Sequence, residues 1–377
     1  MSLAHQVSWE TSVELLAGAQ TTAGAIPAST VHEIYQYGWL RDGSWCAYAL
    51  DRAGKSGATA AWHHWVATTL LAHEHRVDEA LAAVAADRVD GQVMMPARFT
   101  LTGEEESHAD SEEEWPNFQT DCYGFWLWAL ADHVRRGGTL TDPLDRAARL
   151  VVRYLLGAAE TPCFDCWEEH PGNLHTSTLG VIVAGLRDIG AVLDDPQAIA
   201  YAEGLRQRLL GDEFQVAGSL VRFPGDTRVD GSLLWLGVPF GVVEIDSDLY
   251  RTTVQRIDDE LHLPDGGVRR YLGDTFYGGS QWILLAVSLG WARLAMGESE
   301  TAITLLAWIE SNATADGYLP EQVADVVQSP HMLAYWRQKW GATATPLLWS
   351  HAMHLVLLDE IAAHRTTGQQ RSPRTPV

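Results

Sequence analysis

The sequence predicts an all-α protein, an (α/α)6 barrel in which six helical hairpins form a toroid with functional loops at one end. Three observations predict this class. Apolar residues recur at spacings of three and four, and Ala and Leu dominate these segments. Strand patterns are scarce, with one short extended stretch expected near 215–223. Long and short connections alternate along the chain, as expected for hairpins stacked side by side.

The predicted helices all carry this amphipathic pattern. They span 58–73, 122–136, 142–158, 176–190, 196–210, 248–261, 280–296, 298–311 and 346–363.

The long connections between these helices are rich in Trp, Gly and acidic residues. They fall near 31–45, 91–121, 160–175, 221–233, 264–279 and 312–345. No linker rich in Ser, Gly or Pro divides the chain, so we expect one domain over residues 1–365. Residues 366–377 have the composition of a flexible C-terminal tail.

The net charge of the chain limits the classes of molecule that we expect it to bind. With 26 basic and 49 acidic residues, the net charge is −23. A nucleic-acid partner is disfavoured because phosphate binding needs clustered Lys and Arg. An acidic surface also disfavours anionic membranes and anionic substrates, whereas a neutral sugar is compatible with it. The expected partner is a small-molecule sugar, bound by a monomer or small homo-oligomer.

No cofactor or metal is expected. The four cysteines include Cys163-x-x-Cys166, but a zinc site would need a second pair with matched spacing. Phosphate loops and dinucleotide fingerprints are missing from the sequence. The acidic run 104–114 leaves a structural calcium ion open as an alternative to a solvated, mobile loop.

The first ten residues contain neither a basic segment nor an apolar stretch, so we expect no secretory signal and a cytoplasmic location. The longest apolar runs are too short to span a membrane.

Two acidic residues far apart in the sequence carry the functional prediction. Glu168 follows Cys163-Phe-Asp-Cys-Trp167, and Glu321 follows Gly317-Tyr-Leu-Pro320. Both are framed by loop residues and aromatics. A glycosidase needs two such carboxyl groups, one to protonate the leaving oxygen and one to activate water or attack the sugar.

Residues suited to holding a sugar surround these two positions. Trp39-x-Arg41-Asp42 offers a flat wall, a guanidinium donor and a carboxylate that can accept from adjacent hydroxyls. Tryptophans are also expected in long loops, where indole faces suit sugar rings. These loop tryptophans are Trp39, Trp115, Trp167, Trp336 and Trp340.

Several segments, in order, resemble glycoside hydrolase family 15, the glucoamylase family. They are Trp39-x-Arg41-Asp42 with Ala49-Leu-Asp-Arg-Ala-Gly54, Trp115-x-x-x-Gln119-x-Asp121-x-Tyr123-Gly124, Trp167-Glu168-Glu169 with His175-Thr-Ser177, Asp230-Gly-Ser-Leu-Leu-Trp-Leu236, Arg269-Arg270-Tyr271 through Asp274 and Tyr277, Leu319-Pro-Glu-Gln322, and Pro346-Leu-Leu-Trp-Ser-His-Ala352.

This resemblance implies an (α/α)6 glycoside hydrolase domain that removes α-linked glucose from a non-reducing end with inversion. It implies Glu168 as general acid and Glu321 as general base. The other matched positions imply substrate binding by Trp39, Arg41, Asp42, Trp115, Trp167, Glu169, Arg270 and Trp349. Tyr35 or Tyr37 is a candidate for orienting the base.

The chain lacks room for the β-sandwich or starch-binding modules found in many family members, so we expect small substrates such as isomaltose, maltose or short α-glucans. The segment Trp336-Arg-Gln-Lys-Trp340 is expected to cap the pocket and set the leaving-group subsite. Three alternatives stay open: a trehalase of the same fold, a sugar epimerase that works through histidines, and a non-catalytic sugar-binding protein.

Overall fold

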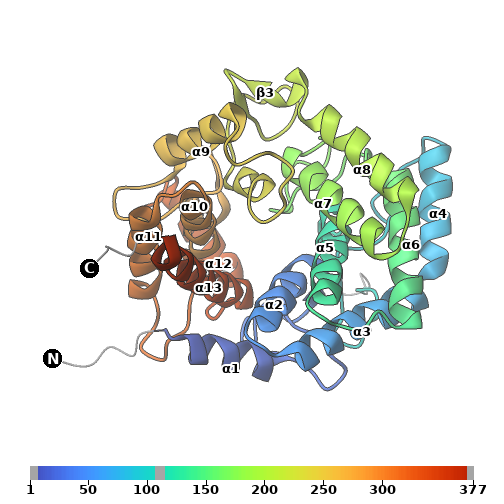
Figure 1. The fold of residues 1–377 in the computed structure, drawn as a ribbon, viewed down its shortest axis with the longest axis horizontal. Coiled ribbons are helices and arrows are strands. Elements are labelled where there is room, and N and C mark those ends of the chain that lie inside the picture. Colours follow the sequence, from blue (N-terminus) through green and yellow to red (C-terminus); the bar gives the residue numbers. More distant parts are fainter. Residues whose placement is uncertain (1–6, 107–114, 372–377) are drawn as a thin grey trace, which may run out of the picture.

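The computed structural model describes residues 7–106 and 115–371. Its helices form a closed ring of two concentric layers (Figure 1). The inner layer contains α2 (Leu40–Arg52), α5 (Asp121–Arg135), α7 (Thr176–Val192), η4 (Gly231–Leu236), α10 (Ile283–Ala295) and α13 (Leu348–Arg371). The outer layer contains α1 (Trp9–Ala19), α3 (Ser56–Ala72), α6 (Asp142–Ala158), α8 (Pro196–Leu209), α9 (Asp248–Leu261) and α11 (Ser299–Ser311). Inner and outer elements alternate along the chain, which confirms the predicted (α/α)6 barrel.

The inner elements are buried on nearly every side. Residues 40–50 of α2 and 121–131 of α5 are all buried, including charged side chains at the start of each helix. The helices α5 and α7 approach so closely that a Cβ at Gly185 would lie 2.4 Å from the carbonyl oxygen of Gly124. Glycine at this contact therefore permits the tight packing of two inner helices.

One inner position is occupied by a short 3-10 helix. The element η4 has six residues, all buried, and Asp230 caps it by accepting from the backbone N–H of Ser232. Pro239 follows soon after and cannot donate to a continuing helix. The ring therefore closes with one reduced inner element between α7 and α10.

The outer helices are amphipathic, and side chains define where several begin. Ser8, Asp195 and Ser247 accept hydrogen bonds from backbone N–H groups in the first turns of α1, α8 and α9. Such caps satisfy donors that have no partner within the helix.

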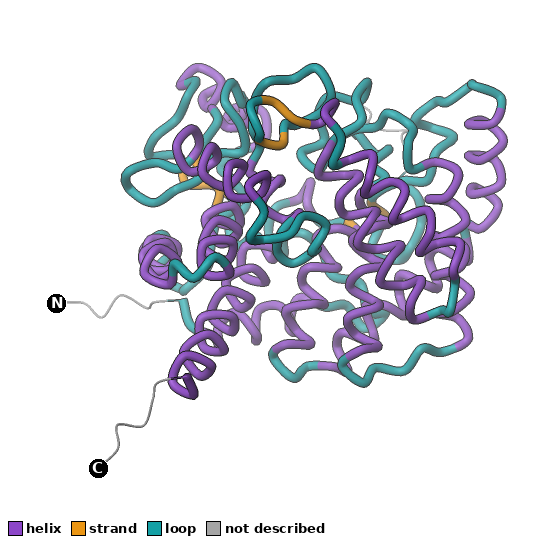
Figure 2. The backbone as a smooth tube through the Cα atoms, turned by 45° about the horizontal axis from the view of Figure 1, so that its top comes forward, coloured by secondary structure: helices purple, strands orange, loops and turns teal. Residues whose placement is uncertain are grey.

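The remaining elements lie in the connections. They are α4 (Glu74–Ala85), α12 (Pro330–Trp340), the short helices η1 (Glu33–Tyr35), η3 (Asp212–Phe214) and η5 (Phe276–Gly278), and the antiparallel pairs β1 (Gly38–Trp39) with β2 (Arg98–Phe99), β3 (Gln215–Val216) with β4 (Ser219–Leu220), and β5 (Gln281–Trp282) with β6 (Gln322–Val323). Figure 2 shows the longer loops gathered toward one end of the helical ring.

Every helix named from the sequence is present, and the described residues contain four further α-helices outside those ranges: α1, α2, α4 and α12. The helix α2 begins at Leu40, inside the predicted loop 31–45, and α12 lies inside the predicted loop 312–345. Both lack the Ala and Leu periodicity of an outer helix, since α2 is buried all round and α12 is rich in aromatics. The expected extended stretch near 215–223 is the short β3–β4 hairpin.

The C-terminal helix extends further than expected. Helix α13 continues to Arg371, so residues 366–371 of the predicted flexible tail are helical, and the rest of that tail lies outside the described residues. The division into one domain and a tail stays a prediction. Within residues 7–106 and 115–371, no helix combines the length and apolar character needed to cross a membrane.

Candidate active site

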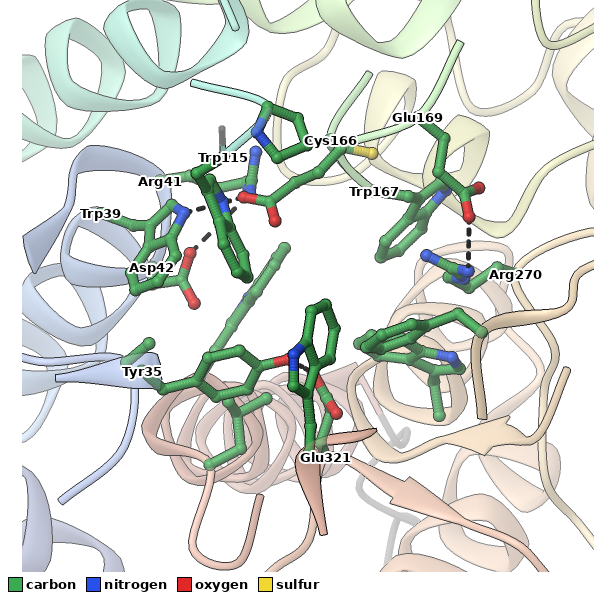
Figure 3. A pocket seen from close by; sticks show the side chains of 18 of the residues that line it. Tyr35, Trp39, Arg41, Asp42, Trp115, Cys166, Trp167, Glu169, Arg270 and Glu321 are labelled. Carbon is green, nitrogen blue, oxygen red and sulfur yellow. Dashed lines mark hydrogen bonds and ion pairs between the residues drawn. The ribbon is translucent and has the colours of Figure 1, made fainter. Parts of the chain in front are cut away.

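A cavity of about 300 Å³ lies among the long loops and the first turns of the inner helices. All ten predicted site residues line it, although they come from segments spread over most of the chain (Figure 3). They are Trp39, Arg41, Asp42, Trp115, Trp167, Glu168, Glu169, Arg270, Glu321 and Trp349. The structure therefore brings together everything that the motifs predicted for the site.

The Glu168 carboxylate is held through one oxygen. Its Oε1 accepts from the Trp39 indole N–H at 2.8 Å and from the Gln119 amide at 3.1 Å, and it lies 3.7 Å from the Arg41 guanidinium. All three contacts use Oε1, so the carboxyl group is oriented with Oε2 as the oxygen available to a ligand.

The backbone that presents Glu168 is unusual. Its φ of 68° lies in the left-handed region, which is costly for a residue with a side chain. Asp165 organises this turn by accepting from the backbone N–H groups of Trp167 and Glu169 at 3.0 and 2.9 Å. Burial raises the pKa of Asp165 to about 8, helped by the nearby Glu169 and opposed by Arg222.

The pair Arg41–Asp42 lies in the first turn of α2 and not in a loop, which corrects the prediction for this motif. Arg41 donates to Gln119 at 2.7 Å and to Asp121 at 3.1 Å, and its Nε lies 3.7 Å from Asp42. Burial raises the pKa of Asp42 to about 7, although Arg41 opposes the shift. The first turn of α2 therefore places both side chains on the cavity wall.

Glu321 reaches the cavity from a different side, and Figure 3 shows it across the opening from Arg41 and Trp115. The Tyr35 hydroxyl donates to its Oε1 at 2.9 Å, and the Gln322 amide donates to Oε2 at 3.3 Å. Burial raises the pKa of Glu321 to about 7, although both hydrogen bonds act in the opposite direction.

The backbone around Glu321 is tied down on both sides. Its N–H donates to the carbonyl of Ala344 at 2.8 Å, and the next residue begins β6, which pairs with β5. The Ser350 hydroxyl donates to the carbonyl of Pro320 at 2.9 Å, so the start of α13 holds the same loop.

A third group of residues lies on the side of Glu169. Its carboxylate accepts from Arg270 at 3.2 Å and also from the Tyr271 hydroxyl. Arg270 is buried, is paired with Asp274, and lies 5.4 Å from the Trp167 ring centroid and 5.3 Å from that of Trp282. The ion pair and the rings fix the orientation of Glu169.

The rim of the cavity includes helix α12, which contributes Trp336, Lys339 and Trp340. These tryptophans are on a helix and not in a loop as predicted. Trp340 stacks on Trp115 with centroids 5.8 Å apart, and Trp336 lies 4.6 Å from Trp340. The helix contains no buried residue, so it lies over the cavity and outside the core.

The structure shows which tyrosine contacts Glu321 and where the histidines near the site motifs lie. Tyr35, and not Tyr37, contacts the predicted base. His170, His175 and His351, the histidines that lie near the site motifs in the sequence, are not among the residues that line the cavity.

The structure adds residues that the site prediction left out. Gln119, which lies inside a quoted motif, contacts Glu168, and Phe276 and Trp282 line the wall beside Arg270. Side-chain chemistry alone gives no signal for these residues, because their role depends on neighbours from other segments.

The cysteines and acidic groups form no metal site in the described part of the chain. All four cysteines are free and buried, and Cys166 lines the cavity. No group of three or more His, Cys, Asp or Glu suited to a metal occurs in residues 7–106 and 115–371. Most of the acidic loop proposed for calcium, 107–114, lies outside the described residues.

Two relatives match nearly the whole of this chain by sequence. The chain is 41% identical, over 350 residues, to an isomaltose glucohydrolase of Kribbella flavida; the match covers 91% of this chain and 89% of that protein. It is also 26% identical to an uncharacterized glycosyl hydrolase of Methanocaldococcus jannaschii, over 94% of this chain and 56% of the relative.

Solved structures of glycosidases have a similar fold. A wild-type glycosidase superposes with a TM-score of 0.88 at 40% identity, covering 94% of this chain and 96% of its own. The glucoamylase of Saccharomycopsis fibuligera shares the fold, with a TM-score of 0.72 at 15% identity, covering 97% and 98% of the two chains. The family model described as glycosyl hydrolases family 15 matches residues 11–288. With its motifs assembled around one cavity, this chain belongs to glycosyl hydrolase family 15 and is a glycoside hydrolase.

Proposed function

We propose that this chain is an inverting, exo-acting α-glucosidase that releases β-glucose from the non-reducing end of small α-gluco-oligosaccharides, with isomaltose as the preferred substrate. The observation that carries the proposal is that Glu168 and Glu321 line one cavity from different sides and in different environments. A relative at 41% identity is an isomaltose glucohydrolase, which supports the choice of substrate.

In the proposed reaction, Glu321 removes a proton from a water molecule whose oxygen attacks the anomeric carbon. Glu168 gives its proton to the glycosidic oxygen as the bond from that oxygen to the anomeric carbon breaks. The configuration inverts because water attacks from the face opposite the leaving group. Tyr35 orients the base through its hydrogen bond of 2.9 Å.

The non-reducing glucose is assigned to the wall formed by Arg41 and Asp42. Asp42 can accept from two adjacent hydroxyl groups, and its position in the first turn of α2 is fixed. Trp39, Trp167 and Trp349 supply apolar faces, and Trp115, Glu169 and Arg270 complete the binding residues. A cavity of about 300 Å³ is at the small end for ligand pockets, which suits a short sugar.

The leaving group is assigned to the rim formed by α12. Trp336 and Trp340 line the cavity beside Trp115, so their rings could stack on the sugar that departs. This rim would then form the leaving-group subsite, which is the role expected from the sequence for residues 336–340.

A substrate panel tests this proposal. Glucose release is measured from isomaltose, maltose, nigerose, trehalose and dextran, and the first-formed anomer is identified by NMR. We expect isomaltose to give the highest kcat/KM and β-glucose to appear first. Cleavage of trehalose alone would replace the proposal with a trehalase, and α-glucose as the first product would exclude inversion.

The location and assembly of the protein stay predictions. We propose a cytoplasmic monomer or small homo-oligomer that binds neither nucleic acid nor membrane, in keeping with its net charge of −23. Light scattering of the purified protein tests the assembly.

A further inference from the structure

A buried arginine outside the cavity lies against the wall that carries the proposed acid. Arg98 is 2% exposed and is not among the residues that line the cavity. Its guanidinium lies 3.9 Å from the Trp115 ring centroid, 4.2 Å from that of Tyr37 and 4.7 Å from that of Trp39. Three aromatic rings therefore surround one cation, in an arrangement that restrains all of them.

The backbone places Arg98 and Trp39 together. They are directly paired residues of the antiparallel strands β2 and β1, and paired residues project to the same face of a ribbon. The backbone N–H of Arg98 also donates to the Asn117 side chain at 3.0 Å, close to Trp115 in the chain. The β1–β2 pairing and the hydrogen bond to Asn117 therefore place the Arg98 guanidinium beside the indoles of Trp39 and Trp115.

A carboxylate fixes the guanidinium in this position. Glu106 accepts from Nε of Arg98 at 2.9 Å and from Nη2 at 2.6 Å, a two-point contact that sets the plane of the guanidinium. A lysine could neutralise Glu106, but it could neither form the planar pair nor stack flat on the rings.

Each indole then makes one contact that matters to the reaction. The Trp39 N–H donates to Oε1 of Glu168 at 2.8 Å, and Trp115 stacks on Trp340 at the rim. We propose that Arg98, held by Glu106, is a positioning residue that orients Glu168 for proton donation through Trp39 and fixes the leaving-group wall through Trp115. This inference rests on the proposed role of Glu168 as the acid.

The test compares two substrates that differ in their need for a proton. The oxygen that leaves isomaltose must be protonated, whereas fluoride leaves from α-glucosyl fluoride without a general acid. We expect Arg98→Lys to lose about tenfold to a hundredfold in kcat on isomaltose, because small displacements of a catalytic group are costly. Most of its activity on α-glucosyl fluoride should remain.

Arg52→Lys is the matched control. The Arg52 side chain is only 9% exposed, contacts two carboxylates (Asp359 and Glu360), and lies 5.3 Å from the Tyr48 ring, but it does not line the cavity. Arg52→Lys should leave the ratio of activity on isomaltose to activity on α-glucosyl fluoride unchanged, even if the melting temperature of the protein falls. Equal losses of Arg98→Lys on both substrates, or no loss on either, would overturn the inference.

Two further variants keep the test decisive. If Arg98→Lys fails to fold, Glu106→Gln removes the charge that fixes the guanidinium and should shift the substrate ratio in the same direction; an unchanged ratio contradicts the inference. Glu168→Gln separates the two proposals. If Glu168→Gln loses as much activity on α-glucosyl fluoride as on isomaltose, Glu168 is not the acid and the proposed function fails. If Glu168→Gln keeps its activity on the fluoride but Arg98→Lys loses activity equally on both substrates, only the role of Arg98 fails.

Discussion

Glu168 and Glu321, the two carboxyl groups proposed for catalysis, have contrasting surroundings. Glu168 presents a single oxygen to an indole N–H, an amide and a guanidinium. Glu321 is buried, accepts hydrogen bonds from the Tyr35 hydroxyl and the Gln322 amide, and has a pKa raised to about 7 by burial. One group is oriented by many donors, whereas the other is desolvated and lightly held.

This difference in surroundings is consistent with the two different catalytic roles proposed for Glu168 and Glu321. The donors on Oε1 of Glu168 leave Oε2 available to a ligand, and in the proposed reaction Oε2 would carry the proton that passes to the glycosidic oxygen. A base with a pKa near 7 is stronger than an ordinary carboxylate, and it is largely ionised only above that pH. The pKa by itself does not assign the roles, because a group near 7 can give or take a proton.

Removing either carboxyl group should have the largest effect. We expect Glu321→Gln and Glu168→Gln each to lose roughly 10²–10⁴-fold in kcat on isomaltose, because general acid and base catalysis are worth about that much. Only Glu168→Gln should recover on α-glucosyl fluoride. Glu244→Gln, at an exposed position, is the control. A loss below about tenfold on isomaltose would rule out the assigned role for that residue.

Loss of the hydroxyl that holds the base should have the next largest effect. Tyr35→Phe removes the bond of 2.9 Å to Glu321, and a hydrogen bond to a charged group is worth about 1.5–3 kcal/mol, or about tenfold to a hundredfold in rate. Steady-state kinetics should show this loss in kcat, while Tyr37→Phe, whose ring contacts Arg98, should have a smaller effect on kcat. Equal losses in the two variants would remove the special role of Tyr35.

The pH dependence tests which group is the base. If Glu321 must be ionised, kcat/KM should fall by about tenfold for each pH unit below a pKa of about 7. Tyr35→Phe should move this limb to higher pH, because its hydrogen bond lowers the pKa of Glu321. If activity were instead lost as the pH rises through 7, Glu321 would be acting as the acid.

The rim should give the smallest effect. Trp340→Ala removes a ring stacked on Trp115, and such contacts are worth about 0.5–1.5 kcal/mol, so KM for isomaltose should rise by about twofold to tenfold. Trp340→Phe should restore most of the affinity. An equal rise in KM for α-glucosyl fluoride, which has no sugar as leaving group, would place Trp340 elsewhere than in the leaving-group subsite.

The sequence predicted five of the six outer helices, all except α1, but it missed the inner helix α2. Outer helices such as α6 and α9 carry an apolar stripe with period 3.6, which is visible without neighbours. Helix α2 is buried on every side and opens with Arg41 and Asp42, so its pattern is that of a polar loop. Burial of those charges is compensated by partners from other segments, which no local pattern reveals.

By itself, the sequence predicted the all-α barrel from its helical periodicity, and its resemblance to a known family predicted the ten residues that line the cavity, Glu168 and Glu321 among them. Periodicity and ordered motifs can be read in this way because they are local properties of the chain. Only the tertiary structure decided which neighbours those residues have. In the tertiary structure Tyr35, and not Tyr37, contacts Glu321, Gln119 contacts Glu168, and Arg98 lies against the ring of Trp39. The physical reason is that pKa and orientation depend on burial and on contacts between segments far apart in the chain.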